Sequence, residues 1–162
     1  MVTGLFRDRE SAERVYNSLR GRGYNDDDVS MMMSDDTRKK YFSDDDKTNF
    51  DTKAWEGAGK GAAIGGTMGA TLAAIAAIGT SVALPGIGLL VAGPLAAGIA
   101  GAGVGGLVGA LIGSGIPEDR AKEYEHGIKE GGILMGVNAR DDADAEYFEN
   151  DWRTNRGENV YR

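Results

Sequence analysis

The chain has 162 residues and lacks cysteine entirely, and it contains a single histidine. Without cysteine it forms no disulfide and offers no thiol for catalysis or metal binding, and this composition fits a reducing compartment. The residues from Met1 to Asp8 also lack the basic stretch followed by an apolar run that marks a cleavable signal peptide. We therefore expect a cytoplasmic protein.

Charge is missing from the middle of the sequence. Between Lys60 and Glu118 there is no charged residue and no histidine, and 18 of the 26 glycines lie between Gly57 and Gly115. The flanks hold all the charge: the part through Lys60 has a net charge of −2, and the part from Glu118 has a net charge of −5. Neither flank presents the basic surface that nucleic-acid binding requires, so we expect no nucleic acid among the partners.

Small residues recur at every fourth position of this charge-free segment. In an α-helix such spacing places them on one face, so the sequence predicts two helices, 57–78 and 94–115, each with a stripe of glycine and alanine. The stripes consist of Gly57, Gly61, Gly65, Gly69 and Ala73, and of Gly93, Ala97, Gly101, Gly105, Gly109 and Gly113. Glycine destabilises a solvent-exposed helix by about 1 kcal/mol, and close approach of another backbone offsets that loss. We therefore predict that these residues pack helices together and join copies of the chain into an oligomer.

The length of the two predicted helices permits a membrane location. Each run has 22 residues, which is roughly 33 Å of helix and matches the hydrocarbon core of a bilayer. The link from 79 to 93 holds Pro85 and Gly86 and is expected to turn the chain back. Both flanks would then lie on the cytoplasmic side of an inner membrane. Trp55, two residues before the first helix, has the position of an interfacial anchor.

The composition of the segment leaves a second setting open. Membrane insertion is driven by large apolar residues, and this segment is mostly glycine and alanine. A charge-free helical hairpin can equally be buried in the interior of a soluble oligomer. The partners expected from the sequence are therefore a second copy of the chain and membrane lipid.

The two flanks have the periodicities of a small α/β unit. Strands are expected at 2–6, 29–33, 133–139 and 159–161, and helices at 9–22, 117–130 and 141–155. On the first of these helices, Ala12, Val15, Tyr16 and Leu19 share one face. Both flanks have the order strand, helix, glycine turn, strand, which is the order of two βαβ halves. The sequence therefore predicts an α+β fold, a ferredoxin-like split βαβ core interrupted by a Gly/Ala-rich apolar helical hairpin.

This division gives four segments. Residues 1–33 are expected to form the first βαβ half, 34–56 an acidic and aromatic linker, 57–116 the glycine-zipper helical hairpin, and 117–162 a helix with the second βαβ-like half. Tyr41, Phe42, Phe50 and Trp55 are the aromatic residues of the linker. Besides the anchoring role of Trp55, these aromatics can dock on the α/β core or on a neighbouring subunit.

Residues with catalytic or ligating potential are few and scattered. His126 stands beside Glu125 on a predicted amphipathic helix, where a lone histidine is more often a surface or packed residue than a general base. The acidic clusters at 26–28, 35–36, 44–46 and 141–144 lack the alternating ligands and central glycine of an EF-hand loop. Residues 101–106 have a glycine pattern without the preceding strand of a dinucleotide site. We therefore expect no catalytic residue, no metal ligand, no cofactor and no enzymatic activity.

The junction after the charge-free segment carries a fairly specific motif. Residues 115–137 read GIPEDRAKEYEHGIKEGGILMGV and directly follow the Gly/Ala-rich segment. This stretch resembles the bacterial general-stress proteins, also called heat-induced or low-temperature-induced proteins, whose N-terminal part is similar to residues 2–33 here. The resemblance covers nearly the whole chain, with departures at 34–56 and in the last dozen residues. It implies a small stress-associated protein with a glycine-zipper insert, and it carries over no biochemical activity.

These features lead to one expected function with two settings. We expect a non-enzymatic, stress-associated protein that oligomerises through its glycine-zipper hairpin while inserted in or attached to a membrane. The alternative is a soluble self-assembling structural protein, a filament, tube or shell with the hairpins buried in its apolar interior. In either setting something must cover the hairpin, because an exposed apolar surface of that size is untypical of a soluble monomer.

Overall fold

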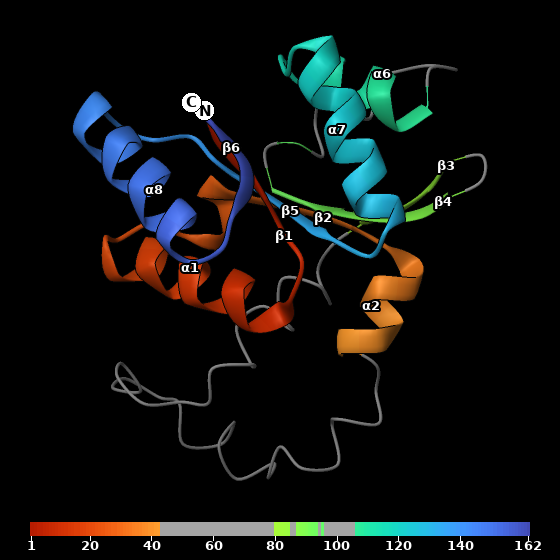
Figure 1. The fold of residues 1–162 in the computed structure, drawn as a ribbon, viewed down its shortest axis with the longest axis horizontal. Helices are drawn as coiled ribbons and strands as arrows, with labels where there is room; N and C mark the ends of the chain where they lie inside the picture. The colour runs from red at the N-terminus through yellow and green to blue at the C-terminus, as the bar shows by residue number, and fades with distance from the viewer. Residues whose placement is uncertain (43–79, 85–86, 94, 96–105) are drawn as a thin grey trace, which may run out of the picture.

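The computed structural model describes residues 1–42, 80–84, 87–93, 95 and 106–162. These residues form an α+β fold built on one six-stranded sheet (Figure 1). In chain order the strands are β1 (Val2–Phe6), β2 (Val29–Ser34), β3 (Thr80–Leu84), β4 (Ile87–Ala92), β5 (Ile133–Val137) and β6 (Glu158–Tyr161). The helices are α1 (Arg9–Gly21), the 3-10 helix η1 (Asp26–Asp28), α2 (Asp35–Phe42), α6 (Gly106–Gly113), α7 (Glu118–Lys129) and α8 (Asp142–Thr154).

The sheet joins strands from the two flanks of the chain. Its strands lie in the order β3-β4-β2-β5-β1-β6, and every neighbouring pair is antiparallel. β5 pairs with β1 on one side and with β2 on the other, so that Val137 is opposite both Val2 and Val29. The first and last parts of the sequence are thereby united in one sheet.

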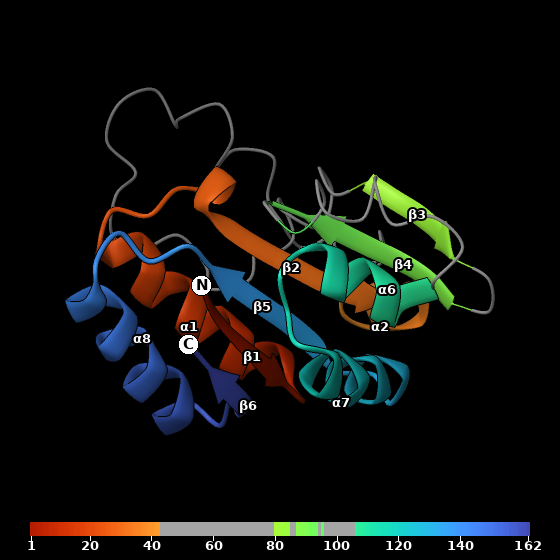
Figure 2. The same ribbon diagram turned by 90° about the horizontal axis from the view of Figure 1, so that it is seen from above.

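The sheet is covered on both faces, which explains why its central strands β2 and β5 are buried along almost their whole length. α1 and α8 cover one face, and α6 and α7 lie against the other (Figure 2). Successive residues of a strand point to opposite faces. Met31 and Met33 of β2 therefore pack in the cluster with α1 and α8, while Met32 packs in the cluster with α6 and α7. All three methionines are buried.

The first hydrophobic cluster fills the space between the sheet and helices α1 and α8. The predicted inward face of α1 is confirmed, since its four members are all buried: Ala12, Val15, Tyr16 and Leu19. α8 contributes Ala145, Phe148 and Trp152 to the same cluster. These seven side chains recur at three- and four-residue spacings, as expected for helices with one buried face.

The second hydrophobic cluster lies between the sheet and helices α6 and α7. The sheet contributes Leu5, Met32 and Leu134, and the two helices contribute Leu107, Ala110, Leu111, Ala121, Tyr124 and Ile128. Leu95, which follows β4, is buried in the same cluster. The Tyr124 hydroxyl group donates to the Asn159 carbonyl oxygen of β6 (2.7 Å). This cluster ties the C-terminal end of the charge-free segment to the α+β core.

The strands and helices of the flanks agree with the sequence-based expectation. Each of them begins and ends within two residues of its predicted bounds. The α+β class is therefore confirmed.

Part of the interval between the flanks differs from the expectation. The predicted linker 34–56 begins with helix α2, whose Tyr41 packs against the first cluster. The predicted link 79–93 is not a simple turn between helices, because it holds β3 and β4. β4 pairs with β2 from Met31 opposite Ala92 to Ser34 opposite Leu89. This pairing supplies partners for backbone groups along one side of β2, and buried backbone groups are almost always paired.

A single uninterrupted helix over 94–115 is also wrong. Gly106 begins α6 with a φ of +66°, and a residue in the left-handed conformation interrupts a right-handed helix. Helix α6 is therefore only eight residues long. Among the described residues, no helix has both the length and the apolar character that crossing a membrane requires. The first predicted helix, 57–78, lies outside the described residues.

Four helices end with the same backbone motif. After α1, α6 and α7, the residue past the cap is a glycine with a positive φ: Gly23, Gly115 and Gly131. In each case the next N–H donates to the carbonyl oxygen five residues earlier. These bonds satisfy the last carbonyl groups of a helix, and glycine adopts the conformation without steric cost. After α8 the same position is occupied by Arg156, with a φ of +65°.

Replacement of Arg156 by glycine is expected to stabilise the protein. Relief of the left-handed strain is partly offset by the greater freedom of glycine in the unfolded chain, so R156G should raise the free energy of unfolding by about 0.5–1 kcal/mol in urea denaturation. The converse control is G131A, where a new Cβ would meet no described atom closer than 3.7 Å. That variant should lose stability through its backbone alone. An R156G protein no more stable than the native chain would contradict the strain at this helix end.

Candidate functional site

Three of the eleven residues in the predicted stripes are described: Gly93, Gly109 and Gly113. The other stripe residues, Gly57, Gly61, Gly65, Gly69, Ala73, Ala97, Gly101 and Gly105, lie outside the described residues, as does Trp55. The described part of the second stripe is divided between two places, the end of β4 and helix α6.

Gly93 lies where the chain passes from β4 onto the face of the sheet that α6 and α7 cover. Its φ is +78°, and a Cβ atom at this position would be 2.0 Å from the Val29 carbonyl oxygen of β2. Leu95 donates its backbone N–H to the buried Ser30 hydroxyl group (3.0 Å), which anchors the chain after the crossing. Gly93 therefore does not extend a helical stripe: it permits close contact with a strand.

Helix α6 has an inner side that packs on the core. Leu107, Ala110 and Leu111 are buried in the second cluster. After the helix, Ile116 is buried in the same cluster, and its N–H donates to the Leu111 carbonyl oxygen (3.1 Å). These contacts hold α6 against α7 and the sheet, so the orientation of its other side is fixed.

The opposite side of α6 is small and apolar. Gly109 and Gly113 are four residues apart and lie on one face of the helix. No described atom lies within 4 Å of the place that a Cβ of Gly109 would occupy. Gly113 is exposed, and the neighbouring Ile112 is 43% exposed. We call Gly109, Ile112 and Gly113 the small face of α6.

A surface of this kind suits contact with another helix. Two glycines at a spacing of four let a second backbone approach closely. An isoleucine beside them adds apolar area, which stabilises a contact by roughly 25 cal/mol per Å² removed from water. α6 contains no polar side chain. The small face can therefore provide packing, and it offers no group for acid–base or ligand chemistry.

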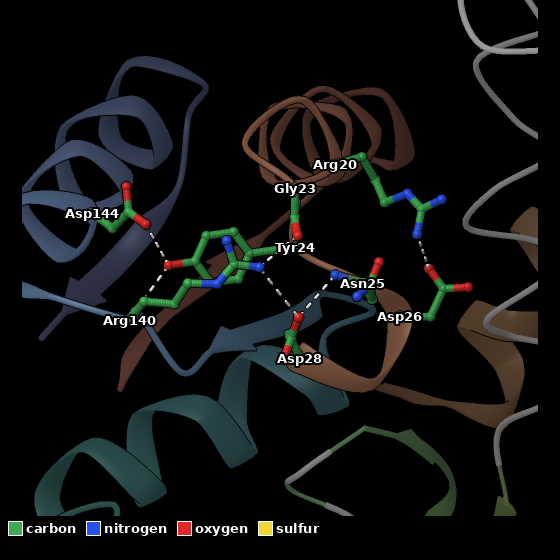
Figure 3. Close-up of polar contacts among 8 residues, drawn as sticks. All are labelled: Arg20, Gly23, Tyr24, Asn25, Asp26, Asp28, Arg140 and Asp144. Carbon is green, nitrogen blue, oxygen red and sulfur yellow. Dashed lines mark hydrogen bonds and ion pairs between the residues drawn. The ribbon is translucent and has the colours of Figure 1, made fainter.

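A cluster of polar residues joins the two flanks at the end of α1 (Figure 3). Tyr24 is buried, and its hydroxyl group donates to Asp144 Oδ2 (2.6 Å) while accepting from the Arg140 backbone N–H (2.9 Å). The Arg140 guanidinium lies 4.1 Å from the centre of the Tyr24 ring and donates to the Gly23 carbonyl oxygen (2.5 Å). Arg22 pairs with Asp144 Oδ1 (2.5 Å). We call Arg22, Gly23, Tyr24, Arg140 and Asp144 the Tyr24 network.

Burial of Tyr24 and its hydrogen bond to Asp144 determine the protonation of the Tyr24 network. Burial raises the pKa of the Tyr24 hydroxyl group, and the hydrogen bond to Asp144 raises that pKa further. The same hydrogen bond is the main reason why the pKa of Asp144 is lowered, and Arg22 adds to the effect. At neutral pH the tyrosine is therefore a protonated donor and the aspartate an ionised acceptor. The network fixes the end of α1, the end of β5 and helix α8 relative to one another.

Two of the acidic clusters of the sequence, at 26–28 and 141–144, have structural partners, and the cluster at 44–46 lies outside the described residues. Asp26 pairs with Arg20 (3.1 Å), and Asp28 accepts a hydrogen bond from the Asn25 backbone N–H (2.9 Å), as Figure 3 shows. Asp141 caps the N-terminus of α8. Within the described ranges, no three side chains of the metal-ligating types gather closely enough to hold a metal ion. Helix starts and turns account for these carboxylates.

His126 lies on the surface of α7, as expected. Its side chain is 75% exposed, and Nε2 is 3.1 Å from Glu130 Oε1. Glu130 also pairs with Arg7, which in turn contacts Glu158 (2.8 Å). The hydrogen bond from Arg7 lowers the pKa of the Glu130 carboxyl group. These residues form an exposed chain of polar contacts between α7, the end of β1 and β6.

Two features of the site were not foreseen from the sequence. The Tyr24 network brings together residues about 120 positions apart, and no local pattern connects them. The one local signal is Tyr24 directly after the helix-ending Gly23, a position that often makes a hydrophobic contact with the helix. The contact of Gly93 with Val29 has no signal at all in the sequence, because it depends on the pairing of β4 with β2.

G93A is expected to undock the hairpin of β3 and β4. The new Cβ would overlap the Val29 carbonyl oxygen, and the positive φ would be strained, so the free energy of unfolding should fall by about 2 kcal/mol or more. Hydrogen exchange of the amides in β3 and β4 measures the undocking directly. The matched control is G109A, which meets no described atom and favours the helix by up to about 1 kcal/mol. Unchanged protection of the hairpin in G93A would argue against the contact.

Y24F is expected to weaken the dependence of the free energy of unfolding on pH in the acidic range. Loss of the hydrogen bond from Tyr24 should let the pKa of Asp144 rise toward its ordinary value, near 3.9. A carboxyl group whose pKa is lowered by folding contributes stability above the unfolded pKa, and that contribution disappears as the pH falls through the folded pKa. The stability difference between native protein and Y24F should therefore be larger at pH 7 than at pH 2 in urea denaturation. Equal differences at both pH values would refute this, and Y147F, at a more exposed tyrosine, serves as the control.

The small face of α6 and the Tyr24 network must be interpreted from their own geometry. No protein-family model matches the sequence, and comparison with curated proteins and with solved structures yields no significant match.

Proposed function

We propose that this chain is a non-enzymatic, stress-associated protein that assembles with copies of itself through its Gly/Ala-rich middle segment. The observation that carries the proposal is the small face of α6, where Gly109, Ile112 and Gly113 form an uncharged, open surface. The association with stress rests on the resemblance of residues 115–137 to the bacterial general-stress proteins.

We assign the two flanks to a ferredoxin-like core. β2, β5, β1 and β6 lie side by side in that order, and all three pairs are antiparallel. α1 and α8, the helices that connect the strands of each half, pack in one cluster on the same face. This arrangement of two βαβ halves supports the assignment. The middle segment is then an insertion between the halves.

The packing of α6 supports a role for its small face in contact between copies. Glycine lowers helix stability, by about 1 kcal/mol per residue when exposed to water. α6 begins and ends with glycine and has a third, Gly109, in its interior. The inner side of the helix uses leucine and alanine to bind the core, so these contacts give no reason for glycine on the outer side. A second helix packed on Gly109 and Gly113 would explain the glycines on the outer side.

Contacts of the middle segment with the sheet favour an assembly in water over a membrane hairpin. Leu95 is buried against the sheet and bonded to Ser30, and Leu107 and Leu111 of α6 are buried in the same cluster. A segment fastened to the core at both places is poorly arranged to form one of two helices across a bilayer. In the assembly we propose, a filament, tube or shell, the middle segments lie inside and the α+β cores outside.

Attachment to a membrane is the second candidate function, and one feature of the sequence favours it. The run 57–78 has 22 residues with Lys60 as its single charge, and Trp55 precedes it. That length matches a bilayer core of about 30 Å. In this version the flanks would lie on the cytoplasmic side, with Trp55 at the interface.

A density gradient separates the two candidates and tests the small face. Native protein from a detergent-free lysate should sediment as a lipid-free particle, and flotation with lipid would favour the membrane version instead. G109L should remain near the top of the gradient, because leucine on the small face keeps the two backbones apart and weakens association by at least about tenfold. Native protein that stayed at the top free of lipid would contradict both versions.

The control for this experiment is A143L, which places the same side chain on an exposed position of α8, away from the small face. It should sediment as the native protein does. Circular dichroism of G109L should show native helix content, since the site is open among the described residues. Sedimentation of G109L indistinguishable from that of A143L would remove the small face from the interface.

A further inference from the structure

The six-stranded sheet has two ends, and β6 at one end is poorly suited to further pairing. β6 is four residues long and contains Glu158. Its register with β1 shifts between the Thr3–Tyr161 and Leu5–Glu158 pairs, and Asn159 has a φ of +48°. Short length, irregular register and charge are the features by which natural sheets keep an edge strand from joining another strand.

Side chains also occupy backbone acceptors of β6. The Asn159 carbonyl oxygen accepts from the Tyr124 hydroxyl group (2.7 Å), and the Val160 carbonyl oxygen accepts from the Arg153 guanidinium (3.3 Å). An added strand would have to compete with these bonds. The β6 end of the sheet is therefore protected.

β3, at the other end, lacks the charge and the irregular register of β6. Its five residues read TSVAL and include no charge and no proline. It pairs with β4 at five consecutive positions, from Thr80 opposite Val91 to Leu84 opposite Ile87, without a register shift. Its other side has no partner strand among the described residues. A regular, uncharged edge strand presents free backbone donors and acceptors and is a template for pairing with another strand.

We propose that β3 pairs antiparallel with β3 of a second copy of the chain, about a two-fold axis that passes by Val82. Every neighbouring pair in the sheet is already antiparallel, so this addition continues the existing pattern. A two-fold axis brings identical strands together in that orientation. Val82 then lies opposite Val82 of the partner subunit, and Thr80 lies opposite Leu84 of the partner subunit. The two copies share one continuous sheet.

Charge favours a second copy as the occupant of this edge. The chain has a net charge of −7, so most contacts between two copies bring acidic surfaces together. β3 belongs to the stretch between Lys60 and Glu118, which has no charged residue. Two copies can therefore meet along β3 without like charges at the contact. Like charges directly opposite each other would destabilise a strand pair.

This interface goes beyond the proposed function and does not depend on the small face of α6. Either surface alone, paired about a two-fold axis, closes a dimer. With both surfaces on one chain, copies are joined alternately through β3 and through α6. The assembly can then grow beyond a dimer.

Disulfide cross-linking tests the β3 pairing, because the native chain has no cysteine. In full-length V82C the two new thiols lie opposite each other across the axis, with Cα atoms about 4.5–5.5 Å apart, a separation that a disulfide can span. T80C is the matched control, because residues 80 of the two copies would be roughly 13 Å apart along the strands. Under mild oxidation V82C should form a covalent dimer at least about tenfold faster than T80C. Equal rates, including no dimer from either variant, would overturn the proposal.

A mixture of T80C and L84C gives a further check on the register. Neither variant alone should cross-link rapidly, whereas the mixture should yield the mixed dimer at a rate near that of V82C. A mixture no faster than its components would contradict the stated register.

Charge variants at the axis provide a readout that is independent of oxidation. V82K and V82E each place like charges opposite each other, while a mixture of the two places opposite charges there. In sedimentation velocity each variant alone should lose the β3 contact, and the mixture should regain it. Recovery in the mixture excludes misfolding as the cause of the loss. If V82K assembles as the native chain does while G109L does not, the β3 proposal fails and the proposal for α6 stands.

Discussion

The pairing of β5 between β1 and β2 is the interaction on which the rest of the structure depends. It joins strands from the two ends of the chain and creates the surface on which both hydrophobic clusters form. Because β2 precedes the middle segment and β5 follows it, both ends of the insertion are fixed at the same sheet. The insertion therefore has to leave from β2 and return to β5, and β4 and α7 accomplish this by packing on the sheet at its edge and on its face.

Glycine serves different physical purposes in the two described parts of the charge-free segment. At Gly93 the absence of a side chain allows contact with the backbone of β2, and the need for it is local. On α6 the glycines leave a helix surface open, and the reason for them lies outside the described contacts of the chain. The same composition thus supports both the internal structure of the fold and the outward surface to which we assign assembly. The sequence-based prediction of helix-packing stripes foresaw only the second of these purposes.

The flanks could be predicted because their information is local. Alternation in the strands, an apolar face on α1 and α8, and glycines after α1 and α7 are all visible within a few residues. β4 could not be predicted, since the stretch from Ile87 to Ala92 is a strand by virtue of its partner β2. In the candidate site, spacing identified Gly109 and Gly113, but the direction they face depends on the burial of Leu107 and Leu111. Likewise the Tyr24 network required the folded arrangement of residues far apart in the chain.

The three consecutive methionines of β2 have a mechanical consequence. They place flexible, unbranched side chains on both faces of the strand, so that Met32 meets the layer of α6 and α7 while Met31 and Met33 meet the layer of α1 and α8. Such side chains can change rotamer and refill space at little cost. A displacement of α6 when a neighbour binds could then be absorbed at Met32. Met31 and Met33, which face the other layer, need not move with it.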